Sequence, residues 1–314
     1  MAINTLEYAK NFQQSLDKQM LVGAISGWME SNAQNVKYSG GDTVKMPEIS
    51  IGGLAKYDRD NGFNQGAVTL KYADYKLTQD RGRTFMLDAM DVDESNFVAS
   101  AGNVMGEFQR TQVIPEVDAF RYSKIAALAK GASHETATFT PDKTNVLEKL
   151  DDEIAKVQDI IGEGEPLVII MATPIRTILN NAKDITKYLD TADFKAGEIT
   201  TKVKTYNEIP ILSVPSARMK TAYVFNDGKT AGQEKGGFKP DAAAKGINWI
   251  IIARRAPIAV SKTDKIRIFE PNVNQKADAW KLDYRKFHDL WIPTNKLAGV
   301  WVNTCLLYTS PSPR

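Results

Sequence analysis

The segment that organises the chain is residues 43–83, which read TVKMPEISIGGLAKYDRDNGFNQGAVTLKYADYKLTQDRGR. Apolar side chains alternate with polar ones along both halves of it, at Val44, Met46, Ile49 and Ile51 going out and at Leu70, Tyr72, Tyr75 and Leu77 coming back. A period of two predicts half-buried strands. Folding the segment at residues 60–61 pairs 44 with 77, 46 with 75, 49 with 72 and 51 with 70. We therefore predict one long antiparallel β-hairpin.

The apolar side of this hairpin changes face once along each strand, at residues 47–48 and 73–74. These changes oppose each other in the predicted register and therefore support it. The polar tip holds Asn61-Gly62, a pair suited to a turn with positive φ, and we expect a β-bulge close to it. At roughly 3.3 Å per residue the arm reaches about 50 Å. Because a lone two-stranded ribbon is marginal in water, we expect it to lie on a neighbouring copy of the chain.

The composition is that of an ordinary globular protein. The chain has 314 residues, of which 43% are hydrophobic and 25% charged, and its formal net charge is +2. Such a small net charge does not steer the protein strongly toward nucleic acid or a membrane surface. No apolar run approaches the ~20 residues of a membrane span, and the first ten residues lack the pattern of a secretion signal. We expect no membrane partner.

The last residues differ in character from the rest. Residues 305–314 read CLLYTSPSPR, which resembles a translated sequencing adapter. We expect this tail to be non-native and the natural end of the protein to lie a few residues beyond residue 304; the alternative is a genuine Ser/Pro-rich tail. Cys305 is the only cysteine, so without the tail disulfides and thiol catalysis are excluded.

Helical patterns flank the hairpin on both sides. Residues 4–30 are amphipathic in part, with Tyr8, Phe12 and Leu16 spaced four apart, and form either a packed helix or an arm that reaches a neighbour. Residues 91–113 and 116–130 predict two helices. Pro115 should push the preceding residue out of the helical region and kink the resulting rod of about 35 residues, roughly 50 Å long at 1.5 Å per residue.

The remainder mixes helices and strands. Residues 145–161 predict a helix, 167–171 a buried strand, and 173–179 a short helix. Strands follow at 209–214, 223–225, 249–252, 258–260, 266–268, 280–284 and 300–302, with a turn at 262–265. Residues 227–246 are rich in Gly, Lys and Ala and predict a mobile surface loop.

Residues able to carry chemistry are sparse. His134 and His288 are the only histidines and lie far apart in sequence, and no Cys/His set has metal-ligand spacing. Asp91 and Glu94 are better explained as a helix cap than as metal ligands. The chain has no glycine-rich phosphate loop and no nucleophile elbow. We expect no enzyme activity, no catalytic, cofactor-binding or metal-binding residues, and no cofactor.

The order of elements and three stretches carry a family resemblance. The stretches are IPEVDAFR (114–121), IRIFEP (266–271), and ADAW (277–280) through YRKFHDL (284–290). They resemble the major capsid proteins of tailed bacteriophages, which have the Hong Kong 97-type capsid fold, and most closely those of phages of Gram-positive bacteria. The resemblance extends over nearly all of residues 1–303.

This resemblance implies an α+β fold with a definite division. It comprises an N-terminal arm (1–38), an extended β-hairpin loop (39–85), a peripheral domain with a long spine helix and a β-sheet (86–143 and 247–293), and an α/β axial domain (144–246). Residues 294–304 are candidates to return to the axial domain. The contacts between subunits would come from the hairpin at Ile49, Ile51, Tyr57, Asp58, Arg59, Phe63, Leu70 and Tyr72, and from the arm at Tyr8, Phe12 and Leu16.

The resemblance also implies a structural function. The protein would self-assemble into hexamers and pentamers of an icosahedral shell that encloses phage double-stranded DNA by non-specific contact. Its place would be the virion, assembled in the cytoplasm of the bacterial host. A separate scaffold protein, a portal and decoration proteins are the expected partners. The alternative within this fold is an encapsulin-like nanocompartment shell that packages cargo enzymes; an α/β enzyme and a surface adhesion protein are rivals outside it.

Overall fold

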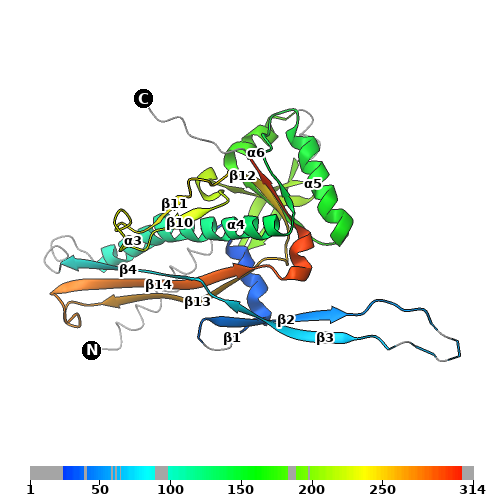
Figure 1. The fold of residues 1–314 in the computed structure, drawn as a ribbon. Coiled ribbons are helices and arrows are strands. Elements are labelled where there is room, and N and C mark those ends of the chain that lie inside the picture. The colour runs from blue at the N-terminus through cyan, green and yellow to red at the C-terminus, as the bar shows by residue number, and fades with distance from the viewer. Residues whose placement is uncertain are drawn as a thin grey trace.

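The computed structural model describes residues 24–38, 41–57, 59–60, 62–63, 65–88, 98–182, 189–196 and 199–305. It shows an α+β body from which one β-hairpin projects (Figure 1). Within these residues the strands form sheets with the orders β5-β15-β12-β6-β9-β8-β7, β13-β14-β4, β1-β2-β3 and β10-β11.

The seven-stranded sheet is the main core of the body. Its strands are β5 (Glu135–Thr136), β6 (Leu167–Ala172), β7 (Leu189–Ala196), β8 (Ile199–Tyr206), β9 (Ile209–Val214), β12 (Ile247–Ala253) and β15 (Val300–Thr304). Every residue of the central strands β6 and β12 is buried, as their continuous apolar runs predict. Helices α5 (Val146–Ile161) and α6 (Thr173–Asn180) and the 3₁₀ helix η5 (Thr294–Gly299) flank this sheet.

A continuous helical rod connects the two halves of the body. It consists of α3 (Val98–Phe108), a π-helical turn (Gln109–Val113) and α4 (Ile114–Gly131). The predicted break at Pro115 is wrong, because Ile114 keeps helical φ and ψ of −59° and −49°. The π turn lies directly before the proline, where a proline ring would otherwise clash with the carbonyl four residues earlier.

The three-stranded sheet packs against this rod. It contains β4 (Gln79–Asp88), β13 (Ile258–Phe269) and β14 (Ala279–Trp291). The turn predicted at residues 262–265 is wrong: β13 passes through this region with only a register shift between Ser261 and Thr263. Asp264 stays in the strand because it accepts hydrogen bonds from Tyr284 (2.8 Å) and Lys286 (2.5 Å) on the neighbouring strand.

Smaller elements complete the body. They are the 3₁₀ helices η1 (Gly27–Asn35) and η4 (Ser216–Arg218) and the short hairpin β10 (Tyr223–Phe225) and β11 (Phe238–Pro240). The mobile loop predicted at 227–246 therefore contains a strand, and the side chain of Phe238 stacks on Phe225. The helix predicted for residues 4–30 falls mostly outside the described residues; its last part is a 3₁₀ helix, not an α-helix.

The projecting hairpin consists of β2 (Thr43–Ile51) and β3 (Val68–Lys76), with β1 (Lys37–Tyr38) beside the base of β2. The predicted register is wrong by two residues, since Val44 pairs with Tyr75 and Ile51 pairs with Val68. The hairpin is also shorter than predicted, because residues 79–88 form β4 of the body. Its ladder ends at Ile51 and Val68, well before the predicted turn. Gly62 has the expected positive φ of 84°, whereas Asn61, next to which the bulge was predicted, lies outside the described residues.

Candidate assembly surface

The base of the hairpin is packed against its own chain. Val44, Met46 and Leu77 are buried there. They contact residues near the ends of β13 and β14, namely Ile258, Val260 and Trp291. Asn32 holds the chain leading into the hairpin, because its side-chain amide donates to the carbonyls of Arg254 (2.9 Å) and Pro257 (2.7 Å). The base is therefore an integral part of the folded subunit.

The distal half of the hairpin presents its apolar side chains on the opposite face. In the observed register Val44 pairs with Tyr75, so these two residues share one face of the hairpin. Val68, Leu70 and Tyr72 are an odd number of residues from Tyr75 along β3 and therefore lie on the other face. Their exposed fractions are 70%, 55% and 48%, and Ile51 opposite Val68 is 71% exposed. The change of face predicted from the sequence is thus confirmed. It separates a face that packs on the subunit itself from a face whose apolar side chains are about half exposed or more.

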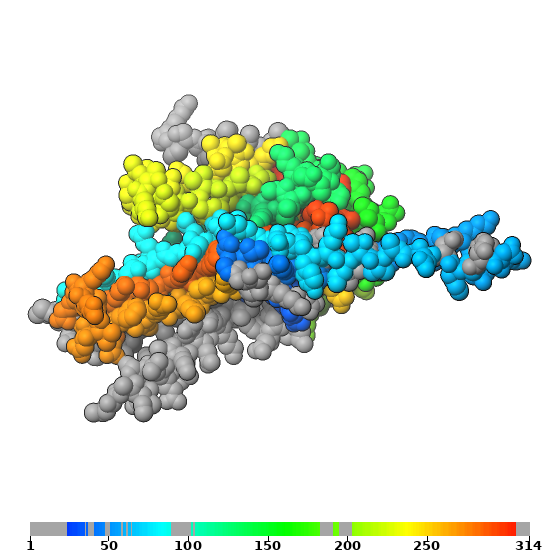
Figure 2. Space-filling model, turned by 60° about the horizontal axis from the view of Figure 1, so that its bottom comes forward, coloured from blue at the N-terminus to red at the C-terminus, as the bar shows by residue number. Residues whose placement is uncertain are grey.

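The loop at the tip adds more exposed apolar surface. Leu54 is fully exposed and Phe63 is 90% exposed. Tyr57 and Phe63 lie across the loop from each other with their rings edge to face, 5.0 Å between centroids, which gives the loop internal order. Figure 2 shows the distal hairpin standing clear of the rest of the molecule. Exposed apolar area concentrated on one projecting element is typical of an interaction surface.

Most of the contact residues predicted from the sequence lie on this surface. The structure places Ile51, Tyr57, Arg59, Phe63, Leu70 and Tyr72 on the exposed part of the hairpin. Ile49 occupies the register position opposite Leu70. Asp58, together with Tyr8, Phe12 and Leu16 of the N-terminal arm, lies outside the described residues. Leu54 and Val68 were missed by the sequence analysis, although both are large apolar residues next to the predicted strand ends.

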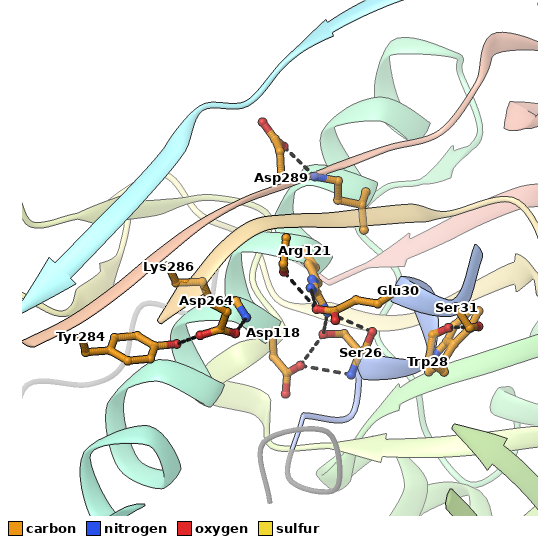
Figure 3. A network of polar contacts seen from close by, with 12 residues as sticks. Ser26, Trp28, Glu30, Ser31, Asp118, Arg121, Asp264, Tyr284, Lys286 and Asp289 are labelled. Carbon is orange, nitrogen blue, oxygen red and sulfur yellow. Dashed lines mark hydrogen bonds and ion pairs between the residues drawn. The ribbon is translucent and has the colours of Figure 1, made fainter. Parts of the chain in front are cut away.

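A buried polar network ties the segment before the hairpin to helix α4 (Figure 3). Asp118 accepts hydrogen bonds from the backbone amide (3.1 Å) and hydroxyl (2.6 Å) of Ser26. Arg121, fully buried, forms an ion pair with Glu30 and donates to the carbonyl of Ser26 (3.1 Å). Arg218 donates to the other carboxylate oxygen of Asp118 at 3.1 Å. The network attaches Ser26 and Glu30 to α4.

The environment of this network shifts the pKa values of its two carboxyl groups, Asp118 and Glu30, in opposite directions. Burial raises the pKa of Asp118 above its ordinary value, and the hydrogen bonds from Ser26 and the charge of Arg218 only partly offset that rise. Burial also acts to raise the pKa of Glu30, but the charges of Arg121 and Lys286 outweigh it and leave the pKa of Glu30 below its ordinary value. Glu30 is therefore the anionic partner of the buried arginine.

Both histidines are built into the packing of the body. His288 is buried, with its ring edge to face against Phe120 at 5.4 Å. Burial, followed by the charges of Lys286 and nearby arginines, holds the pKa of His288 well below its ordinary value. His134 stacks on Trp301, and its Nδ1 lies 2.9 Å from the carbonyl of Leu297. His288 lies on β14 and His134 in the connection between α4 and β5, and the two rings share no partner among these contacts.

Within the described ranges, no group of three or more His, Cys, Asp and Glu side chains is placed to hold a metal ion. A groove of about 730 Å³ lies over the three-stranded sheet. It is lined by charges of both signs, among them Asp80, Lys265, Arg267, Asp283 and Arg285. Of the helices in the described part of the chain, none is long and apolar enough to cross a membrane.

Comparisons with known proteins identify the fold. The chain matches no protein-family model and no curated protein. Among solved structures, a chain of Microbacterium phage Oxtober96 superposes with a TM-score of 0.56 at 10% identity, covering 88% of this chain and 91% of that chain. A chain from the asymmetric unit of the bacteriophage PhiM1 mature capsid gives 0.56 at 10% identity, covering 87% and 84%. This chain has the fold of a phage capsid protein.

The same fold occurs in a particle that is not described as a phage. A chain of a virus-like particle from Pyrococcus furiosus superposes with a TM-score of 0.50 at 11% identity, covering 95% of this chain and 99% of that chain. In the chain described here, the projecting hairpin carries exposed large apolar side chains such as Leu54 and Phe63.

Proposed function

We propose that the chain is a major capsid protein of the Hong Kong 97 type, which assembles with copies of itself into hexamers and pentamers of an icosahedral shell. One observation carries this proposal. The distal hairpin exposes Ile51, Leu54, Phe63, Val68 and Leu70 on an element that stands clear of its own body. Such an apolar face is stabilised in water only when another surface covers it. A second copy of the chain is the partner always present during assembly.

The domain division follows the sheets. The three-stranded sheet and the helical rod form the peripheral domain in this proposal, and the seven-stranded sheet forms the axial domain. The boundary predicted at residue 247 then moves, because β12 pairs with β6 and β15 in the middle of the seven-stranded sheet. Residues 300–304 belong to the axial domain for the same reason. Residues 1–23, with Tyr8, Phe12 and Leu16, are proposed as a second contact between subunits.

Double-stranded phage DNA is the proposed content of the shell, held by non-specific contact, in the virion. A separate scaffold protein, a portal and decoration proteins are the proposed partners, with assembly in the host cytoplasm. An encapsulin-like compartment remains the second candidate, and the nearly complete mutual coverage with the virus-like particle of Pyrococcus furiosus favours it. The two differ in content, since one shell holds nucleic acid and the other holds protein.

Negative-stain microscopy of the purified full-length chain tests the proposal, at high concentration and with a co-expressed scaffold. We expect closed particles or capsomers. Replacing residues 51–68 by Asn-Gly should leave a folded monomer, because Ser50 and Thr69 are paired and can be joined by a two-residue turn. A full-length chain that stays monomeric under these conditions contradicts the proposal. Nuclease-protected DNA in the particles supports the capsid, and protein cargo supports the compartment.

A further inference from the structure

The hairpin meets the body at a joint of two residues. Strand β3 ends at Lys76 and strand β4 begins at Gln79, so Leu77 and Thr78 are the residues between them. Leu77 is buried, and its backbone amide donates to the carbonyl of Asp42 (2.8 Å) across the hairpin base. It is one of two connections between hairpin and body, the other being the chain that enters β2, so a change in the angle between them must alter the joint.

One buried carboxylate is hydrogen-bonded to the joint. Asp289 on β14 is completely buried. Its Oδ2 accepts two hydrogen bonds from Thr78, one from the backbone amide (3.0 Å) and one from the hydroxyl (2.8 Å). Its Oδ1 accepts from the backbone amide of Leu290 (2.6 Å) and forms an ion pair with Lys124 of the spine helix. The carboxylate thus connects three elements: the joint, β14 and α4.

A second contact reinforces the same connection. The ammonium of Lys124 lies 5.6 Å from the centroid of the Trp291 ring, and that ring packs against Tyr75 of the hairpin base at 5.5 Å. The spine helix therefore reaches the hairpin by two routes, one through Asp289 to Thr78 and one through Trp291 to Tyr75. Both routes begin at Lys124.

Because these contacts lie at the base of the hairpin, a small rotation there moves the loop at its tip by a large distance. Each of the two hairpin strands, β2 and β3, is nine residues long. At about 3.3 Å per residue the strands alone carry the loop about 30 Å outward, so a rotation of about 10° at the joint moves the loop by about 5 Å. A shift of that size is enough to take an apolar side chain out of contact with a partner surface.

We propose that Lys124, Asp289 and Thr78 form a joint lock that sets the angle of the hairpin in the unassembled subunit, with Asp289 as the positioning residue. The lock presents the hairpin already oriented, so that binding a neighbour does not also have to order it. The benefit to shell assembly rests on the proposed function. The angle itself is a property of the single chain and can be measured without assembly.

The test measures one distance by double electron–electron resonance. Spin labels are placed at Gln65→Cys in the hairpin loop and at Ala155→Cys on the exposed face of α5, in a Cys305→Ala background; all three positions lie outside the lock. The labelled full-length chain is diluted with excess unlabelled chain, so that only distances within one subunit contribute. We expect a single narrow distance distribution for the otherwise unaltered protein.

The variants are chosen to separate the lock from general loosening of the sheet. Asp289→Asn removes the charge that Lys124 pairs with, and Thr78→Val keeps the side-chain shape but removes one hydrogen bond. Thr84→Val is the matched control, because the Thr84 hydroxyl also donates to an aspartate of β14, Asp283 at 2.8 Å, but from within β4 and away from the joint. We expect the width of the distribution to increase about twofold for Asp289→Asn, less for Thr78→Val, and not for Thr84→Val.

Each outcome decides the proposal. Broadening confined to the two joint variants supports the lock. Unchanged widths for both, or equal broadening in the Thr84→Val control, overturn it. If circular dichroism shows that Asp289→Asn does not fold, the comparison of Thr78→Val with Thr84→Val decides alone, since both threonines are exposed and both changes are small. A chain that never assembles but shows the expected broadening refutes the proposed function and leaves the lock intact.

Discussion

Replacing the exposed apolar face of the distal hairpin should raise the concentration needed for assembly without unfolding the subunit. The perturbation is the triple variant Ile51→Thr, Val68→Thr and Leu70→Thr. Threonine is β-branched and suits a strand, so the hairpin itself should persist. All three residues are more than half exposed in the single chain, and their loss therefore removes little packing within it.

The magnitude follows from the exposed fractions. Fully burying a Val, Leu or Ile side chain stabilises by about 1.5–3 kcal/mol. The single chain leaves 71% of Ile51, 70% of Val68 and 55% of Leu70 exposed, which is the part that a neighbour can cover. Threonine retains one methyl group, so each substitution should weaken the free energy of the contact between subunits by about 1 kcal/mol, and the triple variant should weaken it by about 3 kcal/mol per subunit. At 1.4 kcal/mol per factor of ten, the critical concentration should rise about a hundredfold.

The assay is light scattering against protein concentration, with sizing chromatography of the soluble fraction. Lys71→Thr is the matched control, because Lys71 lies between Leu70 and Tyr72 on the same strand but points to the other face. We expect the critical concentration of the control to stay within about twofold of the parent. If the triple variant assembles at the same concentration as the parent, the apolar face is not a subunit contact and the reasoning fails.

Three further predictions concern the folded body. The fold depresses the pKa of His288, so below about pH 6.5 the unfolded chain binds a proton there that the folded chain does not. As the pH falls from 7 to 5, denaturant titrations should therefore show that the parent loses up to about 2 kcal/mol of unfolding free energy that the His288→Gln variant keeps. Gly82→Ala places a Cβ 2.9 Å from the carbonyl of Tyr284, so thermal unfolding should show a loss of about 1–3 kcal/mol. Arg121→Met leaves Glu30 without its buried partner and should cost about 3–5 kcal/mol.

Each of these has a control or a contrary result. Parallel pH curves for the parent and its His288 variant would show that this ring is not the group that titrates. Gly164→Ala adds a Cβ with no atom within 4 Å, so it should leave the melting temperature nearly unchanged where Gly82→Ala lowers it. Arg110→Met breaks an exposed pair with Glu107 on the same rod, and equal destabilisation by both arginine changes would contradict the role assigned to burial.

The sequence predicted the hairpin and its change of face but not its register. The alternation of apolar residues defines which side of each strand is buried. A register that is wrong by two residues leaves that assignment unchanged, because side chains along a strand repeat every two residues. The register depends on the turn, and the tip is a loop from residue 52 to 67 whose length Asn61-Gly62 could not indicate. The hairpin of β7 and β8 was missed because its apolar face is weakly marked in the sequence: Phe194 and Val203 share it with small or polar residues such as Ala192 and Thr201.

Tertiary contacts decided the other differences. Residues 262–265 are polar and typical of a turn, yet Asp264 is held in β13 by partners twenty or more residues away. The helix continues through Pro115 because a π turn before it accommodates the ring, and local propensity cannot show this. The joint lock was likewise invisible, since Thr78, Lys124 and Asp289 are scattered in sequence and none belongs to a motif.

The change of face along the hairpin explains how one element can serve two purposes. A hairpin with all its apolar residues on one side would either fold back wholly on its own subunit or leave its base unsupported. Here the base places Val44 and Tyr75 toward β13 and β14, and the distal half places Val68 and Leu70 toward the opposite side. The base contacts stabilise the arm before any partner arrives, and the lock at Asp289 limits its direction. Of the two faces of the hairpin, the distal one is left to gain from a neighbour, and in the proposed function its burial is a driving force for assembly and not for folding.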